Sequence, residues 1–175
     1  MKKIILYMAV SLDGYIAERD GSLEWLTGFP NPERTDYGHN DFLSAIDTVI
    51  MGGRTYRELL NMDVIWPYKE QQTYVVSHHD WGAKQGVRFI TENITETIAE
   101  LCKQEGKNIG IAGGGELTSI LLSANLIDEI RILHIPVILG KGVSLFPGQD
   151  KESKWELTVS KPYPNGVLQA TYHRQ

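Results

Sequence analysis

Eight apolar runs of strand length, the early ones separated by segments of helical pattern, constrain the fold more than any other feature. The runs lie at residues 3–10, 47–52, 72–77, 86–90, 108–113, 127–135, 154–161 and 166–173. The helical patterns lie at residues 36–46, 54–61, 93–104 and 115–124. Because strands that alternate with helices form parallel crossover units, this order predicts one α/β domain over residues 1–175.

The last two runs have no helical segment between them. Pro164, Asn165 and Gly166 supply the residues of a hairpin turn at this point. We therefore expect an eight-stranded, mostly parallel sheet flanked by helices, with a C-terminal antiparallel hairpin at one side. The hairpin leaves an edge strand that needs protection, which a second copy of the chain could provide.

Two local features carry further expectations. Residues 11–35 form the one long connection, and long loops in compact domains often cover active sites. Asn93 and Glu96 have the spacing of a capping box at the third helical segment. We expect a substrate-covering loop in the first case and a side-chain cap in the second.

The charges disfavour two classes of partner. Lysine and arginine total 17 against 22 aspartate and glutamate residues, and no basic cluster exceeds Lys2 and Lys3. Nucleic acids and anionic membranes both need a basic surface, so we expect neither as a partner. An anionic ligand would need a local group of donors.

The first residues resemble a secretory signal, because two lysines precede an apolar run from Ile4 to Leu12. The run is short, Asp13 and Glu18 follow at once, and the same residues suit a buried strand of a parallel sheet. Cys102 is the single cysteine, which excludes an internal disulfide and suits a reducing compartment. We expect a cytoplasmic protein.

Three glycine-containing segments follow predicted strands. They are residues 11–17 (SLDGYIA), 51–55 (MGGRT) and 112–117 (AGGGEL). In a parallel sheet all three lie at the carboxyl ends of strands, which is the edge where open α/β sheets hold ligands. The three segments could converge on one cleft.

The second and third segments favour an anionic ligand. Glycine lets a ligand approach the backbone, and each segment opens a helix whose free amides attract anions. Arg54 adds a planar guanidinium that suits a phosphate monoester. The alternative is that these glycines only permit tight turns. Two such segments on one sheet edge favour ligand binding.

Several other chemistries lack their motifs. Neither segment matches GxxxxGK[ST], and neither matches GxGxxG with an acidic residue twenty positions on. His78 and His79 are adjacent, Cys102 has no nearby partner, and no GxSxG sequence occurs. We expect no metal and no covalent nucleophile.

Four ordered segments resemble one superfamily. SLDGYIA resembles the first-strand signature of the riboflavin-pathway reductase domain, the RibD C-terminal domain, and VIMGGRTYREL resembles the strand-to-helix cofactor segment of dihydrofolate reductases. IGIAGGGEL resembles the later glycine motif of both, and residues 120–147 resemble their shared C-terminal strand and loop. The resemblance spans nearly the whole chain and implies a dihydrofolate reductase-like fold.

The resemblance also implies an NADPH site. Arg54 would lie near the 2′-phosphate, Ser77 and His78 beside the adenosine, and residues 113–117 would receive the pyrophosphate and the nicotinamide ribose. The full set of implied cofactor contacts is Ala9, Val10, Ala17, Gly52, Gly53, Arg54, Thr55, Ser77, His78, Gly113, Gly114, Gly115, Glu116 and Leu117.

The implied substrate pocket contains Val10, Asp13, Trp25 and Asp36. Asp13 is the implied catalytic residue, although an aspartate at this position equally caps a turn. Trp25 is either a substrate platform or a buried loop anchor. Asp36, reached by counting back to the position of the pterin-binding carboxylate of dihydrofolate reductases, is either that carboxylate or a helix cap.

One departure from the family pattern bears on the substrate. Riboflavin-pathway reductases place a glutamate just before the later glycine pair, where this chain has Ala112 and Gly113. We expect an NADPH-dependent reductase that transfers hydride to a small pterin- or pyrimidine-like heterocycle and forms a homodimer. The alternative is a non-catalytic NADPH-binding protein of the same fold.

Overall fold

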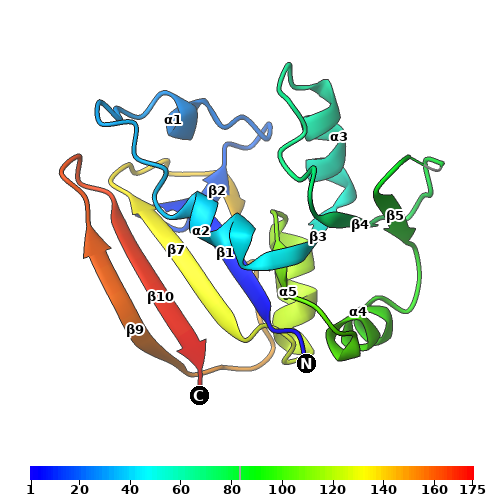
Figure 1. Ribbon diagram of the computed structural model, residues 1–175. Helices are drawn as coiled ribbons and strands as arrows, with labels where there is room; N and C mark the ends of the chain where they lie inside the picture. The colour runs from blue at the N-terminus through cyan, green and yellow to red at the C-terminus, as the bar shows by residue number, and fades with distance from the viewer. Residues whose placement is uncertain (83) are drawn as a thin grey trace.

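A computed structural model describes residues 1–82 and 84–175, and an eight-stranded sheet forms its centre (Figure 1). The strands of this sheet are β1 Ile4–Ser11, β3 Ile46–Gly52, β4 Gln72–Val76, β5 Val87–Ile90, β6 Asn108–Ile111, β7 Glu129–Ile135, β9 Trp155–Pro162 and β10 Leu168–Arg174. A separate two-stranded sheet joins β2 Tyr15–Ala17 to β8 Val143–Ser144. The helices are α1 Glu24–Thr27, α2 His39–Ser44, α3 Gly53–Asn61, α4 Ile94–Lys103 and α5 Gly115–Ser123.

The large sheet has the strand order β5-β4-β3-β6-β1-β7-β10-β9. Every pair from β5 to β7 is parallel, whereas β10 runs antiparallel to both β7 and β9. All eight predicted strands are present, and the expected mostly parallel sheet with a C-terminal antiparallel hairpin is confirmed.

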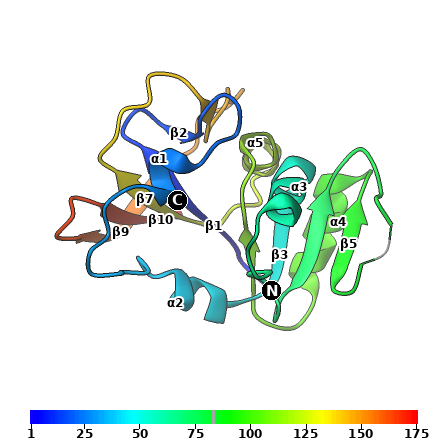
Figure 2. The same cartoon turned by 90° about the horizontal axis from the view of Figure 1, so that it is seen from above.

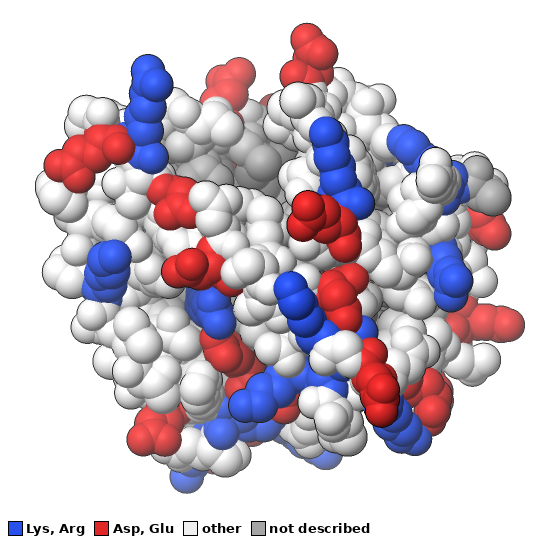
Figure 3. All heavy atoms as spheres, viewed as in Figure 1, with Lys and Arg blue, Asp and Glu red and all other residues white. Residues whose placement is uncertain are grey.

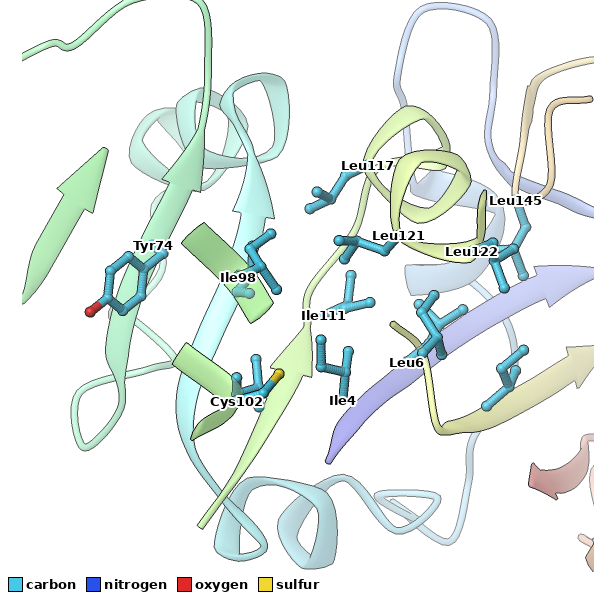
Figure 4. Close-up of a cluster of buried hydrophobic side chains, with 14 of the residues drawn as sticks. Ile4, Leu6, Tyr74, Ile98, Cys102, Ile111, Leu117, Leu121, Leu122 and Leu145 are labelled. Carbon is cyan, nitrogen blue, oxygen red and sulfur yellow. The ribbon is translucent and has the colours of Figure 1, made fainter. Parts of the chain in front are cut away.

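Helices cover both faces of the parallel part of the sheet (Figures 1 and 2). On one face α4 and α5 pack over a core that includes Leu6 and Leu121, and Figure 4 shows the side chains of this core. On the other face α2 and α3 contribute Phe42 and Tyr56 to a second core. The central strand β1 is therefore enclosed by protein on both sides, which explains the unbroken apolar run from Ile4.

The hairpin forms where the turn residues predict it. Gly166 has φ +90° and its N–H donates to the carbonyl of Tyr163, a conformation that glycine adopts without steric cost. Strand β9 is the edge of the sheet, and its Leu157 and Val159 side chains are 53% and 50% exposed. The expected homodimer stays a prediction, with this strand as the surface that would need covering.

Residues 11–35 differ from the expectation of an irregular connection, because they contain β2 and α1. These elements span three and four residues, too few for a periodic pattern to reveal them. Helix α2 is also shorter than predicted, because Gly38 is its N-cap and Asp36 lies outside it.

The predicted capping box is wrong. Asn93 does precede α4, but its φ of 47° places it in the left-handed region and its side chain makes no cap hydrogen bond. Glu96 instead accepts a hydrogen bond from the Thr95 hydroxyl. Spacing alone did not reveal this backbone conformation.

Cys102 is a free cysteine whose side chain is buried in the core beneath α4. Among residues 1–82 and 84–175, no helix has the length and apolar character needed to cross a bilayer.

A largely buried ion pair lies at the amino edge of the sheet. Lys2 Nζ lies 2.6 Å from Asp47 Oδ1 and 3.3 Å from Thr48 Oγ1, and Asp47 Oδ2 accepts the backbone N–H of Lys107. Burial alone would raise the pKa of Asp47, but hydrogen bonds from Lys2, Thr48 and Lys107 outweigh it and lower this pKa. The ionised carboxylate of Asp47 therefore stabilises the folded protein.

We expect Asp47→Asn to lower the free energy of unfolding by about 1–3 kcal/mol at about pH 7, because it leaves the Lys2 ammonium buried without a counter-charge. Water reaches a third of the Asp47 side chain, which reduces the effect below that of a fully buried pair. A carboxyl group whose pKa is lower in the folded protein stabilises the fold at pH values above its pKa in the unfolded chain, about 3.9. This contribution is lost as the pH falls through the pKa of the group in the folded protein. Urea denaturation should therefore show a smaller gap between the two proteins at about pH 3; a constant gap would contradict this assignment.

Candidate cofactor and substrate site

The loops at the carboxyl ends of the parallel strands lie at one edge of the sheet. Residues 12–14 follow β1, residues 53–55 follow β3, Ser77 follows β4 and residues 112–115 follow β6. Since these strands are parallel, the four segments share the edge from which α3 rises in Figure 1. The predicted common edge is confirmed.

Close contacts join these segments in pairs. A side chain at Gly53 would lie 3.0 Å from Ser77 Oγ, and one at Gly113 would lie 3.0 Å from Thr55 Oγ1. A side chain at Gly115 would overlap the backbone oxygen of Ser144 in β8. The two glycine segments proposed to hold phosphates are thus in direct contact, and β8 closes the side of the second.

Both helices that start at this edge have free backbone N–H groups. Gly52 is the N-cap of α3 and Gly114 is the N-cap of α5, and neither helix has a side-chain cap hydrogen bond. The φ angles of Gly113 and Gly114 are +97° and +102°, which other residues rarely adopt. A Cβ at Gly52 would meet no described atom within 4 Å, so the backbone at the start of α3 is open, whereas β8 covers one side of the start of α5. Two neighbouring helix starts without side-chain caps suit a ligand with two phosphates.

Arg54 stands in the first turn of α3 with its side chain 67% exposed. Its Nε lies 3.9 Å from Glu58 Oε1, a long contact for an ion pair, and the first turn holds no acidic residue. A cation at the amino end of a helix opposes the helix dipole, so an anionic ligand would relieve an unfavourable arrangement.

Asp13 links two loops that are far apart in sequence. Its carboxylate accepts hydrogen bonds from Ser11 Oγ at 2.6 Å, from the N–H of Gly140 at 2.7 Å and from the N–H of Leu139 at 3.1 Å. The Ser11 hydrogen bond, with smaller contributions from Gly140 and Leu139, lowers the pKa of Asp13. Asp13 thus fastens the loop after β1 to the loop after β7; its role in catalysis stays a prediction.

Three of the implied cofactor contacts, Ala9, Val10 and Ala17, lie in different parts of the structure. Ala9 packs with the cluster around Leu133, whereas Val10 is 4% exposed and its side chain lies in the core beneath α5 on the opposite face. Ala17 is buried in β2, where its carbonyl meets Gly142. The structure does not bring the side chains of Ala9 and Val10 together.

Trp25 and Asp36 make different kinds of contact. Trp25 packs against the cluster of Leu133, Ile135 and Val167, and its buried Nε1 has no hydrogen-bond partner among the described residues. Asp36 is exposed and accepts the N–H groups of Asn40 and Gly38, which lower its pKa. These contacts tie Asp36 to the start of α2, whose N-cap is Gly38, and its role in substrate binding stays a prediction.

The remaining predicted residues divide between backbone and side-chain candidates. Ser77 is half-buried and its Oγ accepts the N–H of His79, while His78 is exposed beside it. Leu117 is 4% exposed and its side chain belongs to the core beneath α5. Glu116 lines an open hollow of about 530 Å³ between α4 and α5.

Sequence reasoning missed two side chains at this edge. A Cβ added at Gly53 would lie 3.0 Å from Trp81 Cη2, and Arg57 lies over the Trp81 ring with its Cζ 5.3 Å from the centroid. Trp81 follows Ser77 by four residues, and Arg57 follows Arg54 by three. Short spacing from a predicted site residue was the one signal available.

The charges around the site are mixed. Figure 3 shows acidic and basic side chains interspersed over the face viewed in Figure 1, with no broad area of one sign. Among residues 1–82 and 84–175, no group of three or more histidine, cysteine, aspartate or glutamate residues has the arrangement of a metal site.

Comparison with known proteins identifies the family. Residues 2–169 match the family model of the RibD C-terminal domain. The chain belongs to the RibD C-terminal domain family. The uncharacterized protein YwjB of Bacillus subtilis (strain 168) is 39% identical over 167 residues, which cover 95% of each chain.

Two solved structures support the fold of this RibD C-terminal domain. A crystal structure from Shewanella sp. PV-4, provisionally named a riboflavin biosynthesis protein, matches with a TM-score of 0.89 at 32% identity and covers 99% of both chains. Dihydrofolate reductase from Enterococcus faecalis, in complex with NADP(H), matches with a TM-score of 0.71 at 21% identity, covering 99% of this chain and 96% of its own. The fold is dihydrofolate reductase-like, as the sequence resemblance implied.

Proposed function

We propose that this RibD C-terminal domain protein is an NADPH-dependent reductase that transfers hydride to a small pterin- or pyrimidine-like heterocycle. The observation that carries the proposal is the contact between two glycine-capped helix starts, with an exposed arginine on the first. Its family is one of reductase-like folds, and the Enterococcus faecalis relative of the same fold is in complex with NADP(H).

The described residues fit a dinucleotide. The open space at Gly52 would admit a phosphate to the backbone, and the first-turn N–H groups of α3 and α5, which have no side-chain cap, would be the donors for two phosphates. Arg54 would pair with the 2′-phosphate, and Ser77 and His78 would contact the adenosine side. When bound, NADPH supplies the hydride for reduction of a C=N or C=O carbon.

The substrate pocket would lie along the cluster beside β7. Ala9, Trp25, Phe29 and Tyr37 pack there around Leu133 and give the region an apolar, aromatic character. The Trp25 Nε1–H is a buried donor without an acceptor, and a ring nitrogen or carbonyl of a flat substrate could accept it. An apolar wall with one free donor suits a heterocycle.

The proton source follows from the two candidate carboxylates. Hydrogen bonds lower the pKa of both Asp13 and Asp36, so both are ionised at neutral pH and neither is a ready proton donor. We propose water as the donor and Asp13 as a positioning residue that holds the loop over the pocket. Hydride transfer then depends on Asp13 through loop geometry.

NADPH oxidation by the purified protein, measured with pterin and pyrimidine acceptors and with the riboflavin-pathway intermediate, tests this function. We expect turnover of a small heterocycle but weak turnover of the intermediate, because Ala112 and Gly113 replace a polar partner and an unpaired buried group costs about 1–3 kcal/mol. Asp13→Asn should raise KM and lower kcat together, since it weakens the loop contact.

Each alternative gives a different result. Tight NADPH binding without oxidation in the presence of any acceptor would favour a non-catalytic NADPH-binding protein. Efficient turnover of the riboflavin intermediate would overturn the specificity, and unchanged kinetics of Asp13→Asn would remove that residue from the mechanism.

A further inference from the structure

Trp81 stands directly beside the proposed phosphate-binding backbone. A side chain at Gly53 would lie 3.0 Å from Trp81 Cη2 and 3.0 Å from Ser77 Oγ. The indole is 43% exposed although its Cη2 lies this close to the Gly53 position. An exposed aromatic ring at a ligand-binding edge offers a surface on which a planar base can stack.

Two neighbouring aromatic rings fix the position of the indole. Its ring stacks on Tyr56 with centroids 6.2 Å apart at 11°, and Phe89 meets it edge to face at 5.8 Å and 88°. Tyr56 is 3% exposed and belongs to the core beneath α3. Trp81 is therefore a rigid surface whose orientation is set by the core.

Arg57 adds a charge to this surface. Its Cζ lies 5.3 Å from the Trp81 centroid, and within the described residues it has no carboxylate within 4.0 Å. Arg54 is three positions earlier on α3, a spacing that makes the two arginines neighbours on the helix surface. Glu58 offsets part of the positive charge of Arg54 but is not within ion-pair distance of Arg57. An anion between the two guanidinium groups would remove their repulsion.

We propose that Trp81 and Arg57 form the adenosine-recognition platform of this protein. The indole and the planar guanidinium offer flat surfaces on which adenine can stack, and the guanidinium also offers donors to a 2′-phosphate. This inference rests on the proposed binding of a nicotinamide dinucleotide at Gly53. It adds two specificity-determining residues that lie outside the glycine segments.

Adenosine 2′,5′-bisphosphate isolates this end of the ligand and is the probe for calorimetric titration, with adenosine 5′-monophosphate as the comparison. Arg57→Gln should weaken binding of the bisphosphate about tenfold or more and that of the monophosphate much less. Trp81→Leu should weaken the binding of both nucleotides about tenfold, because both stack through adenine. As a control, Lys103→Gln removes a positive charge from the exposed last turn of α4 and should change the affinity for neither nucleotide.

Fluorescence provides a second readout that a purely structural role would not change. Binding of either nucleotide should quench the indole emission of the unmodified protein, and this quenching should be largely lost in Trp81→Leu. Circular dichroism verifies that each variant is folded. If Trp81→Leu does not fold, the test depends on Arg57→Gln, which changes an exposed side chain and should leave the fold intact.

The outcomes separate this proposal from the function on which it rests. If NADPH binds the unmodified protein but Arg57→Gln binds the bisphosphate with unchanged affinity, the platform is wrong and the dinucleotide site stands. If NADPH does not bind the unmodified protein, the proposed function fails and the platform fails with it.

Discussion

Gly115→Ala should unfold at a lower urea concentration than the unmodified protein and should bind NADPH at least about tenfold more weakly. A side chain at this position would overlap the Ser144 backbone oxygen and come within 3.3 Å of Pro147 Cδ. Neither neighbour can rotate away, so the start of α5 or β8 must shift. Overpacking of this kind costs about 1–3 kcal/mol, and the shift displaces the N–H groups proposed to hold the pyrophosphate.

Gly52→Ala is the matched control for crowding at a helix start. Gly52 has φ −75°, and its added Cβ would meet no atom within 4 Å, so stability should change by less than about 1 kcal/mol. A phosphate that approaches this backbone would meet the new methyl group, so affinity should fall while folding does not. An unchanged free energy of unfolding in Gly115→Ala would contradict the close packing at this position. If both variants bind NADPH with undiminished affinity, the phosphates bind elsewhere.

Arg54→Ala should weaken NADPH binding by about ten- to hundredfold and leave NADH binding nearly unchanged. The physical reason is the loss of hydrogen bonds between a charged donor and the 2′-phosphate, which contribute about 1.5–3 kcal/mol. The Arg54 side chain is 67% exposed and its contact with Glu58 is long, so the fold does not depend on it.

Calorimetric titration of both cofactors measures this difference. Lys103→Ala removes an exposed positive charge from the last turn of α4 and should change neither affinity. Equal losses for NADPH and NADH in Arg54→Ala would show that Arg54 does not recognise the 2′-phosphate.

The architecture of the sheet was predictable because its strands are long enough to show a pattern. Strand β1 carries buried residues on both faces and β7 alternates over most of its length, so each leaves a distinct apolar signature. The pairing of β2 with β8 was not predictable, because it joins three residues to two across more than half of the chain. Short strands have no periodicity to detect.

The site shows the same division. Glycines after strands placed the second and third segments on one edge, but the contact of Gly113 with Thr55 depends on how β3 and β6 pair. Asp13 accepts backbone N–H groups 126 and 127 positions away, and no local spacing reveals such a partner. Trp81 was missed because its importance comes from the helix start it contacts.

Calorimetric titration of the unmodified protein with NADPH, with NADH as the comparison, measures whether the paired helix starts bind the cofactor. We expect saturable binding of one NADPH per chain and an affinity for NADH that is lower by about tenfold or more, since NADH lacks the phosphate that Arg54 would bind. Absence of saturable NADPH binding would contradict the proposed function, because the paired helix starts would then serve the fold alone.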